Sequence, residues 1–316
     1  MIARIREPIF ILLLYAAVAT ALGHVDFHIQ PFADQGYANH VPAILAGTEP
    51  APARYRVLAP YIDHRIQLAT GLTPRGAWTV FRWASLFASL LAIHFYLSTW
   101  FSRLRAVLGA LLVAALLPLT MTNGYPFADH FTELCLFTLG CACIARRWDW
   151  AFAVVLILNA FNRETSAFLL PLFLLARPVD RRRLIWAGAL GLVWLAIYAG
   201  LRWRLGLQLY NPWQLRQNID FVFFSNWGPG WDWYQRHRAW FGFILIAPLI
   251  WGVVTAWPWL PRFLRMSSGI VAPLFLITAC LFSSIIEARM LTPLVPLLLP
   301  AALFVFGRPN DAPSTR

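Results

Sequence analysis

Residues 24–62 read HVDFHIQPFADQGYANHVPAILAGTEPAPARYRVLAPYI and form a long polar stretch just after the first apolar segment of the chain. The stretch is unusual because 59% of the 316 residues are hydrophobic and only 13% are charged. A polar loop of this length between membrane spans is either a tether or a functional part. Because it combines carboxylates, histidines, arginines and aromatics, we interpret it as functional and the rest of the chain as the scaffold that holds it.

The overall composition lies far outside that of soluble globular domains and predicts a polytopic, all-α membrane protein. One transmembrane domain over residues 1–316 accounts for the length, with no separate soluble domain. We expect about ten transmembrane helices, including short re-entrant-like helices, and a long first outer loop.

The basic residues are all arginines, 26 in number, and give a net charge of +12. They are scattered between apolar spans, and no basic domain with base-stacking aromatics accompanies them, which argues against a nucleic-acid partner. Arginine offers a planar fork that pairs bidentately with phosphate or carboxylate. The arginines are therefore suited to pairing with phosphate or carboxylate groups.

The first apolar segment, Pro8–Leu22, follows Arg4 and Arg6, so the positive-inside rule places the N-terminus in the cytoplasm. We interpret the segment as an uncleaved signal anchor, and a signal peptide cleaved near residues 19–21 is the alternative. The polar loop then lies outside the inner (plasma) membrane, and both termini are cytoplasmic. The expected spans are Pro8–Leu22, Ala77–Phe101, Ala106–Leu119, Phe127–Ala145, two short helices within Asp149–Ala176, Leu184–Trp203, Trp240–Trp257, Ser267–Ile286 and Met290–Phe306.

The segment Asp149–Ala176 is too long for one span of about 20 residues and too short for two. Short basic loops flank it on both sides, so both of its ends are expected inside. We therefore predict a hairpin of two short helices with Arg163 and Glu164 at its tip. Helices that stop within the membrane are tolerated where their ends are buried in protein or line a wet cavity.

With this topology the charged residues gather in the outer half of the protein. Charges inside spans are costly and usually face a cavity and pair with each other. Asp129 and Glu133 are four residues apart and share a helix face, although Asp129 could simply cap its helix. Arg163 and Glu164, and likewise Glu287 and Arg289, could also be ordinary turn charges.

Arg54 and Arg56 are two residues apart in what we expect to be an extended stretch, so both should point the same way. Plain amphipathicity is the alternative explanation of this alternation.

Histidines and cysteines are the candidate metal ligands. His24, His28, His40 and His64 leave a divalent metal open as a cofactor, but none of their spacings is a strong metal motif. Cys135, Cys141, Cys143 and Cys280 all lie in apolar spans, so we expect small core residues, with neither disulfide nor metal.

Taken together, these short motifs resemble those of a known family. The first outer loop carries Asp34 in FADQGYANH and the later YRVLAP, a second outer span begins with PFAD, NRET marks the hairpin tip, and EAR precedes a proline-rich last span. This pattern is similar to that of the bacterial polytopic glycosyltransferases of the GT-C superfamily, which use polyprenyl-phosphate-linked sugars. Many members have more spans and a soluble outer domain.

The resemblance implies transfer of a sugar to an unidentified acceptor at the outer (periplasmic) face. It implies that Asp34 is the catalytic carboxylate of the first loop, with Asp26 as the competing choice, and that Asp129 is the second acidic residue. It further implies that the donor phosphate or the substrate is bound by Arg54, Arg56, Arg163, Glu164, Glu287 and Arg289. A carboxylate would deprotonate or orient the acceptor hydroxyl, and cations would stabilise the leaving phosphate.

Two other functional classes stay open. A transporter or lipid flippase would also bury charges, but at the midplane and often in two related halves, which this sequence lacks. A non-catalytic envelope-assembly protein is the other alternative.

Overall fold

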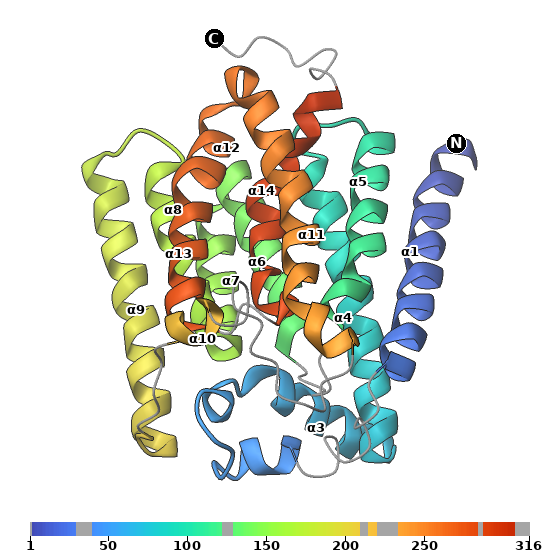
Figure 1. The fold of residues 1–316 in the computed structure, drawn as a ribbon, viewed down its shortest axis with the longest axis vertical. Coiled ribbons are helices and arrows are strands. Elements are labelled where there is room, and N and C mark those ends of the chain that lie inside the picture. The colour runs from blue at the N-terminus through green and yellow to red at the C-terminus, as the bar shows by residue number, and fades with distance from the viewer. Residues whose placement is uncertain are drawn as a thin grey trace.

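A computed structural model describes residues 2–29, 40–121, 129–208, 214–219, 233–283 and 287–306. Regular secondary structure in these residues is entirely helical, and Figure 1 shows the helices as an upright bundle. The helices are α1 (Ile2–Ile29), α3 (Leu58–Thr70), α4 (Pro74–Leu97), α5 (Arg103–Leu116), α6 (Asp129–Arg146), α7 (Asp149–Asn162), α8 (Leu169–Leu175), α9 (Arg181–Leu205), α10 (Leu215–Ile219), α11 (Trp233–Ala256), α12 (Arg262–Met266), α13 (Ala272–Phe282) and α14 (Leu294–Leu303).

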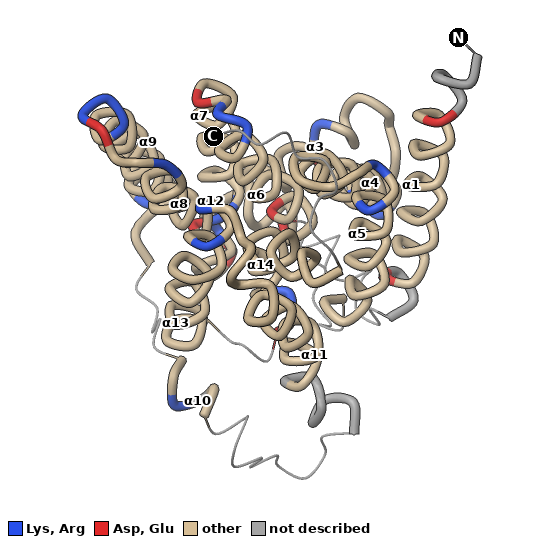
Figure 2. The backbone as a smooth tube through the Cα atoms, turned by 90° about the horizontal axis from the view of Figure 1, so that it is seen from above, with Lys and Arg blue, Asp and Glu red and all other residues tan. Residues whose placement is uncertain are grey.

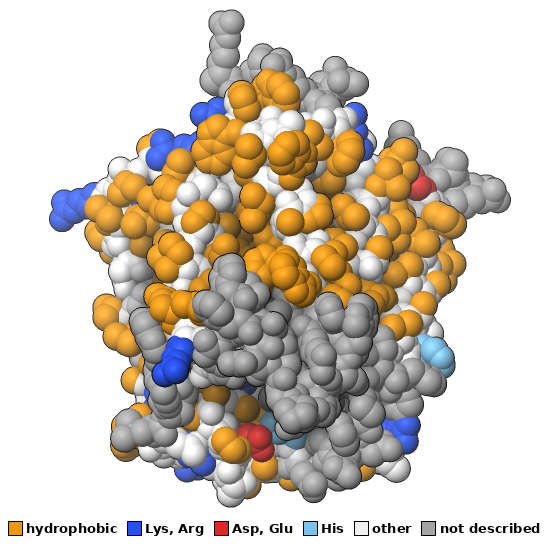
Figure 3. Space-filling model, viewed as in Figure 1, with side chains coloured by type: hydrophobic (Ala, Val, Ile, Leu, Met, Phe, Trp, Pro, Cys, Tyr) orange, Lys and Arg blue, Asp and Glu red, His pale blue; other side chains and the backbone are white. Residues whose placement is uncertain are grey.

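Six helical stretches among the described residues are long and apolar enough to cross a membrane, which confirms the prediction of an all-α chain with several such helices. They are Glu7–Asp26, Pro74–Leu97, Arg103–Thr120, Arg181–Leu205, Trp240–Trp259 and Arg262–Phe282. On the face seen in Figure 3, hydrophobic side chains cover a broad band of the surface. Such a band is the surface that a lipid environment requires.

The predicted hairpin in Asp149–Ala176 is present as two short helical arms. The helix α7 forms the first arm, and the 3₁₀ turn Glu164–Phe168 leads into the second, α8. Phe152 and Phe173 stack between the arms with their ring centroids 4.9 Å apart. Arg177 pairs with Asp149 at 2.6 Å and closes the open end. Arg163 and Glu164 therefore lie at the tip, as predicted.

The most deeply buried helices are α6 and α14, which other helices surround in Figure 2. Every residue of Leu294–Ala302 in α14 is buried, so this helix is apolar on all sides. Gly252 lets α11 approach α14, since an added Cβ would lie 2.8 Å from that of Ala302. The helix α6 is also buried, but it begins with polar residues, so its N-terminal end needs polar partners inside the protein.

The amphipathic helix α3 was not predicted, because we expected residues 24–62 to form a loop. The structure places the 3₁₀ turn Ala53–Tyr55 and then α3 in this region. Gly71 ends α3 in the left-handed conformation, with φ 67°, as helix-terminating glycines commonly do. The buried face of α3 packs through Ala59 on Trp78 and Phe81 of α4, and α3 lies across one end of the bundle (Figure 1).

Asp63 lies on the buried face of α3, outside the membrane-spanning segments, and is only 4% exposed. In the described part of the chain, no hydrogen-bond donor reaches its Oδ1 atom. Burial raises the pKa of Asp63 to about 7 from its usual 3.8. Below about pH 4 the carboxyl is protonated in both the folded and the unfolded chain, and its burial then carries no charge penalty.

We expect Asp63→Asn to flatten the pH dependence of stability. Between about pH 4 and pH 7 the unfolded chain ionises this carboxyl while the folded chain holds its proton, so wild-type stability falls as pH rises through this window. Thermal unfolding in detergent from pH 4 to 8 should show a smaller decline in the variant and a higher Tm than wild type at pH 8. Glu7→Gln, which alters an exposed ion pair, is the control. Equal slopes in Asp63→Asn and wild type would refute this account of Asp63.

Candidate functional site

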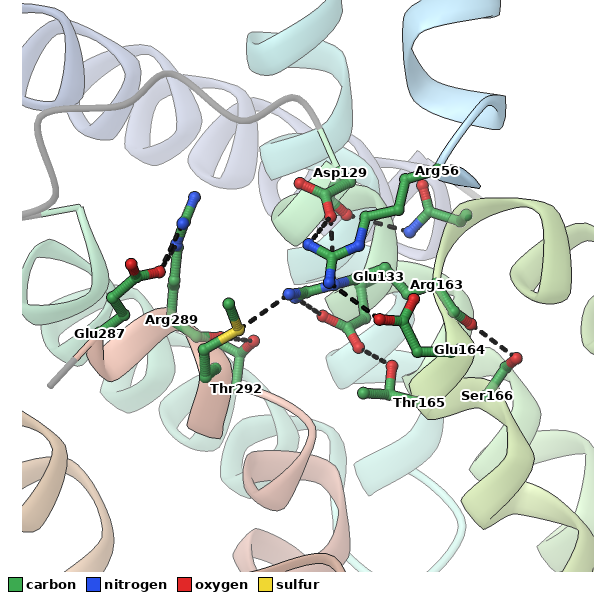
Figure 4. Close-up of polar contacts among 12 residues, drawn as sticks. Arg56, Asp129, Glu133, Arg163, Glu164, Thr165, Ser166, Glu287, Arg289 and Thr292 are labelled. Carbon is green, nitrogen blue, oxygen red and sulfur yellow. Dashed lines mark hydrogen bonds and ion pairs between the residues drawn. The ribbon is translucent and has the colours of Figure 1, made fainter. Parts of the chain in front are cut away.

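A cluster of buried charges lies at the end of the bundle that α3 covers, and Figure 4 shows how its members face one another. Its centre is Asp129, the first residue of α6. Asp129 Oδ2 pairs with Arg56 Nη1 at 3.2 Å and with Arg163 Nε at 3.1 Å. Three segments far apart in the sequence therefore meet at a single carboxylate.

Glu133 lies one turn further along α6, is fully buried and takes part in the same cluster. Its Oε2 pairs with Arg163 Nη1, and its Oε1 accepts a hydrogen bond from the Thr165 hydroxyl. The sequence showed that Glu133 shares a face with Asp129, yet Glu133 was not among the predicted site residues. The i, i+4 spacing was the signal that could have included it.

Arg163 joins the hairpin tip to α6. Its backbone is extended, with φ −155° and ψ 145°, which ends α7 and turns the side chain toward α6. Beyond its two carboxylate partners, its Nη2 lies 2.9 Å from the Met290 sulfur. The neighbouring Asn162 donates to the Asp129 carbonyl at 3.0 Å. The tip is therefore fixed against α6, and Arg163, which is 3% exposed, makes its contacts inside the protein.

Arg56 connects the polar segment to the hairpin. It donates from Nη2 to Glu164 Oε1 at 3.0 Å, in addition to its contact with Asp129. Its neighbour Arg54 does not join this cluster. Arg54 instead donates from Nε to the Glu49 carbonyl at 2.9 Å and also bonds the Gly47 carbonyl. The expectation that the two arginines point the same way was wrong, because residues 53–55 form a 3₁₀ turn and not an extended strand.

Arg289 and Glu287 lie at the edge of the cluster, just before α14. Arg289 donates from Nε and Nη2 to Glu287 Oε2, at 2.8 and 2.5 Å. The Arg289 side chain is 5% exposed and that of Glu287 is 26% exposed. Burial lowers the pKa of Arg289, and the nearby carboxylates Glu287 and Asp129 oppose that shift. Arg289 is thus close enough to Asp129 to interact with its charge, while its direct ion pair is with the partly exposed Glu287.

The charges of the cluster nearly balance. Its three guanidinium groups, of Arg56, Arg163 and Arg289, face the four carboxylates of Asp129, Glu133, Glu164 and Glu287. Buried ion pairs of this kind are costly to break, since a lone charge would stay in the protein interior. An incoming anion would compete most readily for Arg289, because Arg289 pairs with the half-buried Glu287, whereas Arg56 and Arg163 each pair with the buried Asp129.

Asp26 lies apart from these contacts, at the other side of α4. Its Oδ2 pairs with Arg82 Nη2 at 2.5 Å, and the side chains of Asp26 and Arg82 are only 4% and 5% exposed. The pair borders an apolar cavity of about 890 Å³ between α1 and α4. Asp34, the preferred catalytic residue, lies outside the described residues.

The predicted metal ligands are dispersed. The described residues contain no group of three or more His, Cys, Asp or Glu side chains placed to hold a metal ion together. The side chain of His28 lies outside the described part. The four cysteines are free thiols, with Cys141 and Cys143 buried and Cys135 and Cys280 partly buried.

Of the predicted site residues, four lie together in one cluster: Arg56, Asp129, Arg163 and Glu164, with Glu133 as an additional member. Arg289 and Glu287 lie beside this cluster. Arg54 and Asp26 make their contacts elsewhere. Comparison of the chain with protein-family models, with curated proteins and with solved structures finds no match.

Proposed function

We propose that this chain is a membrane glycosyltransferase that moves a sugar from a polyprenyl-phosphate donor to an acceptor hydroxyl. The observation that carries the proposal is the convergence of three arginines with four carboxylates at one end of an apolar helical bundle (Figure 4). A lipid-linked donor would keep its chain among apolar helices and present its phosphate at the end of the bundle. The bond between the sugar and the phosphate would then lie beside the charged cluster.

The residue chemistry supports this reaction class. Cleavage of the bond between the sugar and the phosphate leaves negative charge on the polyprenyl phosphate, and a preorganised cation stabilises that charge. Arg289 is the arginine best placed for this role, because its ion pair is with the partly exposed Glu287, whereas Arg56 and Arg163 each pair with the buried Asp129. Arg56 and Arg163 then position Asp129 and Glu164 from within the protein.

The full arrangement that we propose has about ten spans in the inner membrane, both termini in the cytoplasm and the charged cluster facing outside. It is supported by the helical arms at Asp149–Leu175, whose tip contributes Arg163 and Glu164 to the cluster. It is also supported by the position of α3, which covers the same end of the bundle (Figure 1). A transporter would instead require charged sites near the bilayer midplane.

We expect Arg289→Lys to weaken use of the donor by about one to two powers of ten. Lysine keeps the charge but loses the planar fork, so two hydrogen bonds to phosphate become one point contact. A hydrogen bond to a charged group is worth roughly 1.5–3 kcal/mol. The measurement is KM and kcat for a polyprenyl-phosphate hexose with the protein in liposomes.

The matched control is Arg216→Lys on α10, where the side chain is exposed. It should leave donor use within about twofold, as exposed charges contribute little. Equal losses in Arg289→Lys and Arg216→Lys would indicate diffuse electrostatic attraction and would contradict a specific phosphate site at Arg289.

A further inference from the structure

A histidine and a carboxylate form a half-buried pair beside the charged cluster. His40 Nδ1 lies 2.9 Å from Glu49 Oε1, and their side chains are only 16% and 19% exposed. An ionised carboxylate can only accept hydrogen bonds, so the pairing places a proton on Nδ1. In the neutral ring Nε2 is then the basic nitrogen.

The turn that carries Glu49 is itself held in place. Arg54 donates to the Glu49 carbonyl at 2.9 Å and also bonds the Gly47 carbonyl. Gly47 has φ +66°, a conformation that side-chain-bearing residues rarely adopt. The amide of Ala51 donates to Gln208 Oε1 at 2.7 Å, which ties the turn to the end of α9. Arg54, which lies outside the charged cluster, thus fixes the backbone of the turn that carries Glu49.

His40 also adjoins the charged cluster. Together with Arg56, Trp78 and Asp129 it lines a small cavity of about 10 Å³. A volume of this size is about the minimum that one water molecule, or one hydroxyl group, requires. The charges of Asp129 and Arg289 both act on the imidazole. The cavity therefore joins a potential base to the two residues that pair at the centre of the cluster.

We propose that His40 is the general base that accepts the proton of the acceptor hydroxyl, with Glu49 as the positioning residue that orients its ring. The inference rests on the proposed glycosyl transfer and adds a residue to it. The proton moves from the hydroxyl to Nε2 of His40 as the hydroxyl oxygen bonds to the anomeric carbon. The bond from that carbon to the phosphate oxygen breaks, and its electron pair leaves with the polyprenyl phosphate. Asp34 would then orient the acceptor.

The surroundings of His40 suit a base at neutral pH. Burial lowers the pKa of His40, and Arg289 acts in the same direction, whereas Glu49 and Asp129 oppose the shift. Arg56 lines the same cavity. The ring is therefore neutral at pH 7 and able to take a proton, and kcat should fall only on the acidic side of the usual histidine range.

The test uses the full-length chain in liposomes with polyprenyl-phosphate glucose, mannose and arabinose, and an envelope extract as the source of acceptor. Mass spectrometry of released polyprenyl phosphate gives kcat and KM whatever the acceptor is. We expect His40→Ala to lower kcat by about 10²–10⁴ with little change in KM. Added imidazole should restore part of the rate, because alanine leaves room where the ring was.

The matched control is His64→Ala, a half-buried histidine of α3 that should retain wild-type kcat. Glu49→Gln keeps the shape of the pair but removes the charge that raises the pKa of His40, so the acidic limb of kcat should move to lower pH. An unchanged kcat in His40→Ala, or an unmoved acidic limb in Glu49→Gln, would overturn the role of His40 while transfer stands. Absence of release by the wild type from every donor would overturn the proposed function and this inference with it.

Discussion

Replacing Arg163 with alanine is expected to lower the free energy of unfolding by about 3–5 kcal/mol, the usual effect of removing one partner from a buried ion pair. The variant would leave Asp129 without one of its two guanidinium partners and Glu133 without its ion-pair partner, in a site where Arg163 is 3% exposed. It would also detach the hairpin tip from α6. Arg163 thus has a structural role as well as its place in the site.

The loss can be measured by thermal and denaturant-induced unfolding of the purified protein in detergent. Arg103→Ala is the matched control, because Arg103 pairs with Glu7 at 2.9 Å but their side chains are 42% and 60% exposed. Exposed pairs of this kind contribute about 0–1 kcal/mol. Similar effects of Arg163→Ala and Arg103→Ala would contradict the buried network.

Asp34→Asn is expected to lower sugar transfer by about 10²-fold while leaving the unfolding free energy unchanged, because a reacting hydroxyl that loses its orienting contact is misplaced. Asparagine keeps the size and much of the hydrogen bonding of aspartate but cannot hold the acceptor hydroxyl with a negative charge. The prediction stands on the resemblance of FADQGYANH to a first-loop catalytic motif. Turnover with a polyprenyl-phosphate hexose in liposomes is the measurement.

Asp26→Asn provides the comparison for this second prediction. Because Asp26 pairs with the buried Arg82, its loss should reduce stability and affect transfer only through the amount of folded protein. If Asp26→Asn lost turnover while staying folded and Asp34→Asn kept near-normal turnover, Asp26 would be the catalytic carboxylate. Normal turnover in both variants would refute a carboxylate of the first loop in the mechanism.

The positions of the apolar helices could be predicted from the sequence because length, hydropathy and flanking arginines constrain them directly. The hairpin at Asp149–Leu175 is an example, since its odd length and its basic flanks required two short arms. The helix α3 was missed because it is polar on one side and lies at the end of a long polar stretch of sequence. Its signal was the apolar spacing of Leu58, Ile62 and Ile66, followed by Gly71.

The sequence predicts which residues belong to the charged cluster better than it predicts which of them pair with each other. Sequence position places these residues at one end of the bundle, because Arg56 lies in the first outer loop, Asp129 begins an outer span and Arg163 lies at the hairpin tip. It does not show that Arg163 pairs with Glu133, that Arg54 binds carbonyls of its own turn, or that Glu49 reaches back to His40. The last two pairings depend on the three-dimensional path of residues 40–57 and the first on how α7 packs on α6, and the hydrophobic pattern leaves both undetermined.

The most direct test of the glycosyltransferase assignment is whether the wild-type chain releases polyprenyl phosphate from a polyprenyl-phosphate hexose or pentose. The assay uses purified protein in liposomes, an envelope extract as acceptor source, and mass spectrometry of the released lipid. We expect release that grows with time and protein amount, depends on the extract and falls about 10–100-fold in Arg289→Lys. Folded wild-type protein that released no more polyprenyl phosphate than empty liposomes, from every donor tested, would contradict the assignment.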